Sequence, residues 1–140
     1  MPLSDPGYEK ASPDVTSARN SLAAHVRQEL ERAGIPAALL DMRTPASPPG
    51  AEIECDLGAD AAGGVFVQWN AGQSLRDAAG ESLMKQDLQA PAVKHNGAVG
   101  SAMCAAMVGI LRSAGFQAVE SEDDMRPFTV EVQGWSDPAS

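Results

Sequence analysis

Residues 51–69 read AEIECDLGADAAGGVFVQW, and this stretch decides the fold class of the chain. Apolar and acidic residues alternate along its first part, which is the pattern of a half-buried strand. The inward residues are Ala51, Ile53, Cys55 and Leu57. VFVQW is a second strand of the same kind, with Val65, Val67 and Trp69 inward. Two such strands joined by the glycine-rich turn GADAAGG predict an antiparallel hairpin.

Helical patterns flank the hairpin on both sides. Residues 12–34 predict a helix that Ser12 caps and Gly34 ends. A second helix is predicted for residues 75–88, capped by Ser74, and a third for residues 97–114, capped by Asn96. The remaining segments with strand character are residues 35–42, 116–121 and 127–135.

These elements predict one α+β domain with a mostly antiparallel sheet of four or five strands and about three helices packed on one face. The domain spans residues 12–136, between a flexible tail at 1–11 and a short tail at 137–140. LERAGIPA (30–37) and LRSAGFQA (111–118) share a helix end followed by a strand start. Two helix–strand–strand units would explain this likeness. The alternative is that Ala-Gly is simply a common way to end a helix in alanine-rich chains.

The helix at 97–114 predicts where the core lies. On a helical wheel, its large residues gather on one side, centred on Met107, and its alanines and glycines lie opposite. We expect the large side to be buried and the small side to allow a close contact within the chain or with another subunit. The predicted core residues are Leu22, Val26, Leu30, Ile53, Val67, Met107, Val130 and Val132.

Composition narrows the classes of partner. The formal net charge is −9, which argues against nucleic acid and is compatible with a basic protein partner or self-association. The uncharged run at 96–111 is shorter than the roughly 20 residues of a membrane-spanning helix. Cys55 and Cys104 show no metal-binding spacing, and the N-terminus lacks a signal-peptide pattern. We therefore expect a cytoplasmic protein with two thiols, a disulfide between them being the alternative, and neither metal nor cofactor.

Two surfaces are candidate binding sites. Alternation predicts an outward sheet face on which acids flank two aromatic residues, a composition typical of protein-binding surfaces. Its residues are Glu52, Glu54, Asp56, Phe66, Glu131 and Trp135. The expected start of the third helix, where free backbone N–H groups attract anions, is a candidate phosphate site. Its residues are Lys94, His95, Gly97, Gly100 and Ser101.

No pattern of nucleophile and base points to a reaction. The sequence therefore favours a non-catalytic protein-interaction module of the adaptor, chaperone or inhibitor type that uses the acidic, aromatic face. The alternative is a protein or enzyme that binds a small phosphate-containing ligand at residues 94–101. An ordinary solvated sheet face would explain the first site equally well.

Overall fold

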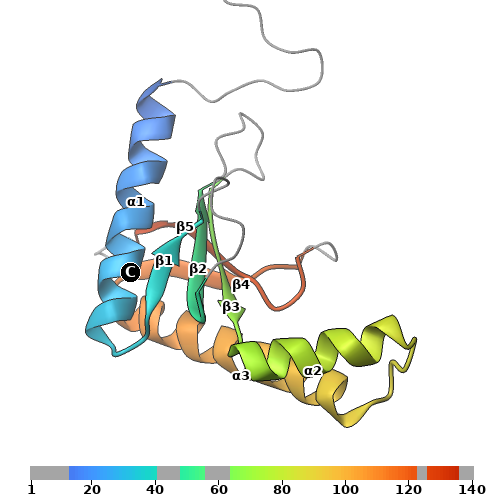
Figure 1. Ribbon diagram of the computed structural model, residues 1–140. Coiled ribbons are helices and arrows are strands. Elements are labelled where there is room, and N and C mark those ends of the chain that lie inside the picture. Colours follow the sequence, from blue (N-terminus) through green and yellow to red (C-terminus); the bar gives the residue numbers. More distant parts are fainter. Residues whose placement is uncertain (1–12, 41–47, 56–63, 123–125, 136–140) are drawn as a thin grey trace, which may run out of the picture.

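A computed structural model of the chain describes residues 13–40, 48–55, 64–122 and 126–135. Its architecture is α+β, as predicted, with a five-stranded sheet in the order β1-β2-β3-β5-β4 (Figure 1). Only β1 and β2 run parallel, and the other neighbouring strands are antiparallel. The predicted tails at 1–11 and 137–140 and the hairpin turn lie outside the described residues.

The elements follow one another in the predicted order. The helices are α1 (Pro13–Arg32), α2 (Gln73–Met84) and α3 (Pro91–Ser113). The strands are β1 (Ala37–Leu39), β2 (Gly50–Cys55), β3 (Val65–Asn70), β4 (Phe116–Glu120) and β5 (Val130–Trp135). In Figure 1, α1 stands along one side of the sheet, and α3 passes below the sheet and continues outward beside α2.

One hydrophobic core joins α1, the second half of α3 and the inner sheet face. Every predicted core residue is buried except Leu22, which is partly buried against the same cluster. Each fully buried aliphatic side chain contributes roughly 1.5–3 kcal/mol, so this cluster accounts for most of the hydrophobic stabilisation. The core also contains Ala23, Phe116 and Ala118, for which the sequence carried no prediction of burial.

The parallel pairing of β1 and β2 depends on a close backbone approach at Gly50. The N–H of the next residue, Ala51, donates to the carbonyl of Pro36 at 2.8 Å. A Cβ at position 50 would lie 2.5 Å from that carbonyl oxygen, and the φ angle of Gly50 is +127°. Both conditions require glycine, because an L side chain would meet backbone atoms and rarely adopts this conformation.

The two segments that share a sequence pattern both end a helix in the same way. Gly34 follows α1 and Gly115 follows α3, with φ angles of +94° and +100°. After α1, the N–H of Gly34 donates to Glu31 and that of Ile35 to Leu30, which is a Schellman cap. The strands that follow differ, because β1 and β2 are parallel whereas β4 and β5 are antiparallel.

The predicted start of the third helix was wrong. α3 begins at Pro91, with Ala90 as its N-cap, so residues 91–96, which precede the predicted start, are also helical. Proline suits the first helical position because its missing N–H has no partner there in any helix. The predicted cap at Ser74 was also wrong, since α2 begins at Gln73 after Gly72 and has no side-chain cap.

α2 and the first half of α3 form a two-helix arm that projects from the sheet (Figure 1). We define the arm as residues 73–103, which comprise α2, the turn that follows it and the first part of α3, and the body as the rest of the described chain. α2 packs chiefly against α3 and does not cover the sheet. The prediction that about three helices cover one sheet face therefore applies to α1 and the second half of α3.

β5 begins at Val130, three residues after the predicted start. Alternation along the predicted strand at 127–135 places Phe128 on the inward face with Val130 and Val132, but Phe128 precedes the strand, has a φ of 54° and is 42% exposed. Trp135 was expected on the outward face. A register shift opposite residues 117 and 118, and the φ of +142° at Gly134, instead place Trp135 against Phe116 on the side of α1.

Within the described ranges, every helix is too short or too polar to cross a membrane.

Candidate functional site

Three of the predicted partner-binding residues form a row across adjacent strands on the outer sheet face. Glu54 on β2 lies opposite Phe66 on β3, and Phe66 lies opposite Glu131 on β5. Their neighbours in each strand point into the core, so the row lies on the opposite face. We call Glu54, Phe66 and Glu131 the acidic–aromatic row. Its aromatic member is only 5% exposed.

The row holds a guanidinium group from the same chain. The Cζ of Arg126 lies 4.0 Å from the ring centroid of Phe66. Its Nη1 donates to the Oε2 of Glu54 at 2.7 Å. A guanidinium is planar and always charged, so it can stack on a ring while it pairs with a carboxylate. The acids and the aromatic residue therefore make a cation site that arginine fits by shape and charge.

The segment that carries this arginine is short and strained. We call residues 126–129 the strap, because they connect the outer face to the start of β5. Phe128 in the strap adopts the left-handed region, which costs a non-glycine residue about 1–3 kcal/mol. The ion pair between Arg126 and Glu54 is partly exposed, with side-chain exposures of 28% and 40%, so it contributes about 1 kcal/mol or less. A stacked cation adds about 0.5–1 kcal/mol. The contributions of these two contacts are thus similar in size to the strain at Phe128.

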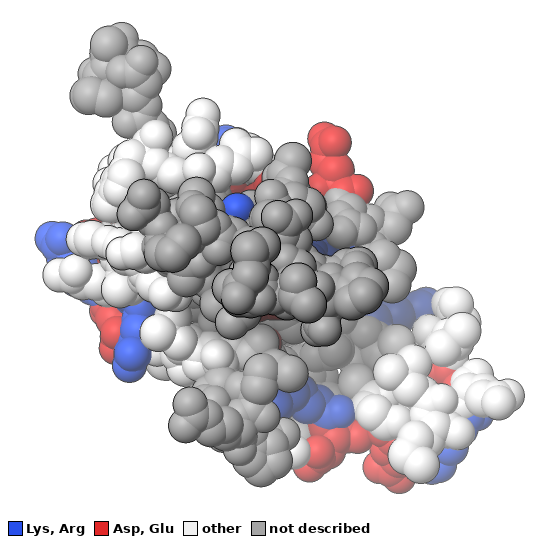
Figure 2. Space-filling view, turned by 90° about the horizontal axis from the view of Figure 1, so that it is seen from above, with Lys and Arg blue, Asp and Glu red and all other residues white. Residues whose placement is uncertain are grey.

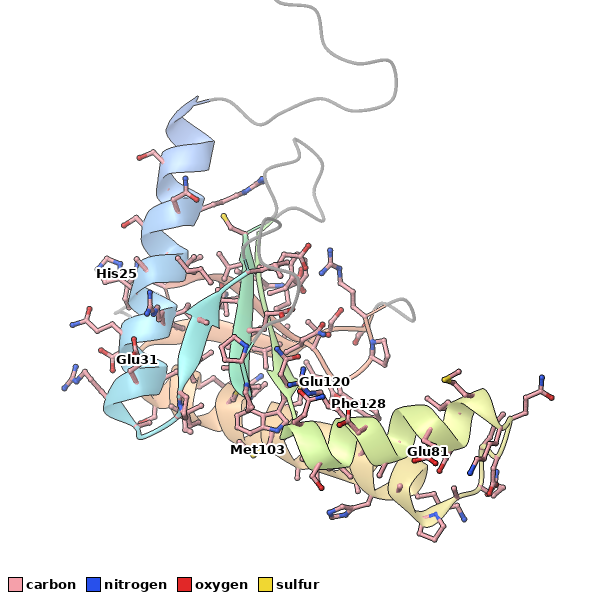
Figure 3. The ribbon with its side chains drawn as sticks, in the orientation of Figure 1. His25, Glu31, Glu81, Met103, Glu120 and Phe128 are labelled. Atoms are coloured by element: carbon pink, nitrogen blue, oxygen red, sulfur yellow. The ribbon has the colours of Figure 1, made fainter. Side chains whose placement is uncertain are left out.

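A groove of about 750 Å³ lies between the strap, the end of β3 and the arm. Its walls are mainly apolar or uncharged, and the side chain of Phe128 lies over Gly100. Figure 3 shows Phe128 where the arm joins the body and Glu81 further out along the arm. The lining of the groove includes Trp69, Val93, Gly97, Gly100, Arg126 and Phe128.

The other predicted partner-binding residues are not part of the row. The carboxylate of Glu52 accepts a hydrogen bond from the Nδ2 of Asn70 at 3.1 Å. Trp135 stacks on Phe116 with 4.2 Å between ring centroids and meets the edge of His25 from α1 at 5.5 Å. Asp56 lies outside the described residues. The structure therefore brings together Glu54, Phe66 and Glu131 and places Trp135 on the opposite face.

The predicted anion site does not lie at the start of a helix. Lys94, His95, Gly97, Gly100 and Ser101 all lie inside α3, which begins at Pro91. The N–H of Lys94 already donates to the carbonyl of Ala90 at 3.1 Å, as in any helix interior. Gly97 and Gly100 instead form a wall of the groove, whereas Lys94, His95 and Ser101 are exposed. The free donors on which the phosphate hypothesis depended are not present at these positions.

The cysteines belong to the body. Cys104 is buried in the core and Cys55 is half-buried, and no disulfide joins them. Burial raises the pKa of the Cys104 thiol, and the negative charge of Glu120 raises this pKa further. In the part of the chain that the structure describes, no group of three or more His, Cys, Asp or Glu side chains is placed to hold a metal ion.

Charge is mixed on at least one face of the molecule although the net charge is −9. On the face shown in Figure 2, acidic and basic side chains of the described residues are interspersed. Recognition of a charged partner would therefore depend on a local arrangement such as the acidic–aromatic row rather than on the field of a whole face.

Comparison with protein-family models, curated proteins and solved structures finds no match for this chain.

Two residues of the strap, Arg126 and Phe128, were not among the predicted site residues. Arg126 lies in the segment between the two predicted strands at 116–121 and 127–135, and alternation along the second of these strands favours an inward Phe128. The available signal was Pro127, which restricts the residue before it and is uncommon inside a paired strand. That signal would have ended the strand pattern before Phe128.

Proposed function

We propose that this chain is a non-catalytic protein-interaction module whose acidic–aromatic row receives an arginine side chain of a protein partner. The observation that carries the proposal is the guanidinium of Arg126 on Phe66 and Glu54. A site that holds an arginine of its own chain has the shape and charge for an arginine from another. Glu131, on the far side of Phe66, supplies a second carboxylate.

Exchange between the two arginines is energetically reasonable. The contacts of Arg126 are partly exposed, and release of the strap would let Phe128 leave its left-handed conformation. A partner's arginine would make the same contacts without that strain. The partner would therefore compete with the chain's own side chain, and its surface would be basic, as the acidic charge of the chain favours.

The test uses Arg126→Ala and measures binding of a fluorescent arginine-containing peptide by anisotropy. Removal of the internal competitor should tighten binding by about tenfold relative to wild type. Substitution of lysine for arginine in the peptide should weaken binding, because an ammonium group does not stack as a planar fork does. Adding Glu54→Gln to Arg126→Ala should abolish the gain.

Lys85→Ala is the matched control for charge, because it also removes one positive charge but lies on the exposed arm. Glu81→Gln is the corresponding control for loss of an acid. If Arg126→Ala and Lys85→Ala increase affinity equally, the effect is general electrostatics and the proposed site is wrong. Arg126→Gln keeps a polar side chain at this position and serves as the second variant if the melting temperature of Arg126→Ala falls.

A further inference from the structure

The strap is fixed firmly at only one of its ends. Thr129, its last residue, is 2% exposed, and its carbonyl accepts a hydrogen bond from the N–H of Ser121 at 2.7 Å. Arg126 is half-buried, and Phe128 is exposed and adopts the left-handed region directly before the fixed residue. Displacement of the strap from the acidic–aromatic row would therefore end at Thr129 and would remove the three residues 126–128.

These three residues occupy two neighbouring positions. The guanidinium of Arg126 lies on the acidic–aromatic row, and the Cδ2 of Phe128 lies 3.8 Å from the place that a Cβ of Gly100 would take. The second position belongs to the groove, where the arm joins the body (Figure 3). Side chains two residues apart in an extended segment point to the same side, and two residues span at most about 7 Å. One short segment can thus reach both positions, as the strap does.

Exchange of the arginine would vacate the second position as well. Only Pro127 separates Phe128 from Arg126, so a partner that displaces the guanidinium also moves the ring. The ring would leave an apolar position beside Trp69 and Val93. Even with Phe128 in place, the groove of about 750 Å³ has the size of a pocket that holds a small ligand. An apolar side chain suits this position, because burying a charge there without a partner would be costly.

We propose that the partner's binding segment carries an arginine and, two positions later, an aromatic residue, so that the segment replaces both Arg126 and Phe128. The inference rests on the arginine site proposed above and adds a second anchor to it. An aromatic ring fits the second position because that position already holds one, beside an α3 wall where Gly97 and Gly100 carry no side chain. The partner's segment does not continue into β5, so its backbone is not held in the left-handed region that Phe128 adopts.

The test measures peptide binding by fluorescence anisotropy to a chain in which both positions are vacated. Arg126→Ala/Phe128→Gly removes the guanidinium and the ring, and glycine adopts the left-handed region without strain, so the fold should be retained. The first peptide carries one arginine and a phenylalanine two positions after it. Three further peptides replace the phenylalanine by alanine, move it to the position directly after the arginine, or replace the arginine by alanine. The first peptide should bind about tenfold more tightly than each of the others.

Gly97→Leu in the same chain tests whether the ring enters the groove. The leucine side chain would occupy open space on the α3 wall, and leucine favours the helix. The tenfold preference for phenylalanine over alanine should be lost, while the peptide with alanine should bind as before. Gly109→Leu is the matched control, because Gly109 lies on the same helix, also with nothing within 4 Å of an added Cβ, but outside this groove. This control should retain the preference.

The outcomes distinguish the second anchor from the arginine site. Arginine peptides that bind equally well whatever follows the arginine would overturn the second anchor and leave the arginine site intact. A preference for phenylalanine that survives Gly97→Leu would show that the ring binds elsewhere, which also overturns the second anchor. If replacing the arginine does not weaken binding, or if no peptide binds, the arginine site itself is wrong, and so is the inference that rests on it.

Discussion

The two halves of α3 lie in different surroundings although they form one continuous helix. In the body, Cys104, Met107 and Leu111 are at most 1% exposed and pack against α1 and the sheet. In the arm, no described residue of α3 is buried, and Ala79 is the buried residue of α2. The body therefore has a core, whereas the arm is a pair of helices held together by small residues. The comparison shows that a helix can continue beyond the part that a core stabilises, although most helical stability comes from tertiary contacts.

The largest expected effect is the removal of a core side chain from the body. Met107→Ala should lower the free energy of unfolding by about 2–5 kcal/mol, because it leaves a cavity among fully buried residues. Val99→Ala in the arm removes a half-buried side chain and should cost about 1 kcal/mol or less. Urea denaturation of the two variants measures both values. Equal costs would show that the arm is packed as tightly as the body.

The second expected effect is a difference in local opening. Hydrogen exchange followed by mass spectrometry should show amides of residues 73–100 exchanging at least about tenfold faster than those of residues 104–113. The physical reason is that opening the arm exposes little apolar surface, while opening the second half of α3 exposes the core. Uniform protection along α3 would contradict the division into arm and body.

The third expected effect has opposite signs in the two regions. Gly34 in the body and Gln86 in the arm both occupy the left-handed position of a Schellman cap, with φ angles of +94° and 59°. Gly34→Ala should destabilise the chain by about 1 kcal/mol, and Gln86→Gly should stabilise it by up to about 1 kcal/mol. Thermal denaturation gives both values. A destabilising Gln86→Gly would mean that the Gln86 side chain makes contacts that outweigh its backbone strain.

The smallest expected effect is a dependence of stability on pH at the junction of the arm and the body. The pKa of the Cys104 thiol is raised in the folded chain. As pH rises above the ordinary thiol value of about 8.5, the unfolded chain loses the proton first, so stability falls. In Cys104→Ala, the decrease in the free energy of unfolding between about pH 8 and 10 should be smaller, because the thiol no longer contributes to it. The substitution also lowers stability at every pH. An unchanged slope would mean that the fall at high pH comes from other groups.

Much of the body was predictable because it follows local rules. Alternation in AEIEC and VFVQW placed the hairpin, and the helical wheel placed Met107 in the core. Pro91 could have given the true start of α3, but Asn96 and Gly97 offered a competing cap signal. Trp135 could not be placed, because a one-residue shift in strand register reverses the face of every residue beyond it. That shift depends on how β4 pairs with β5. The alternation of residues within one strand carries no information about this pairing.

The sequence by itself determined the α+β class, the antiparallel hairpin and the composition of the core, because these depend on the periodicity of apolar residues along short segments. The tertiary structure decided which surfaces exist. Arg126 reaches Glu54 across 72 positions of sequence, and the strap lies beside the glycines of α3 only after the sheet and the arm have formed. Contacts between residues so far apart depend on strand order and register, and these are properties of the packed chain rather than of any one segment.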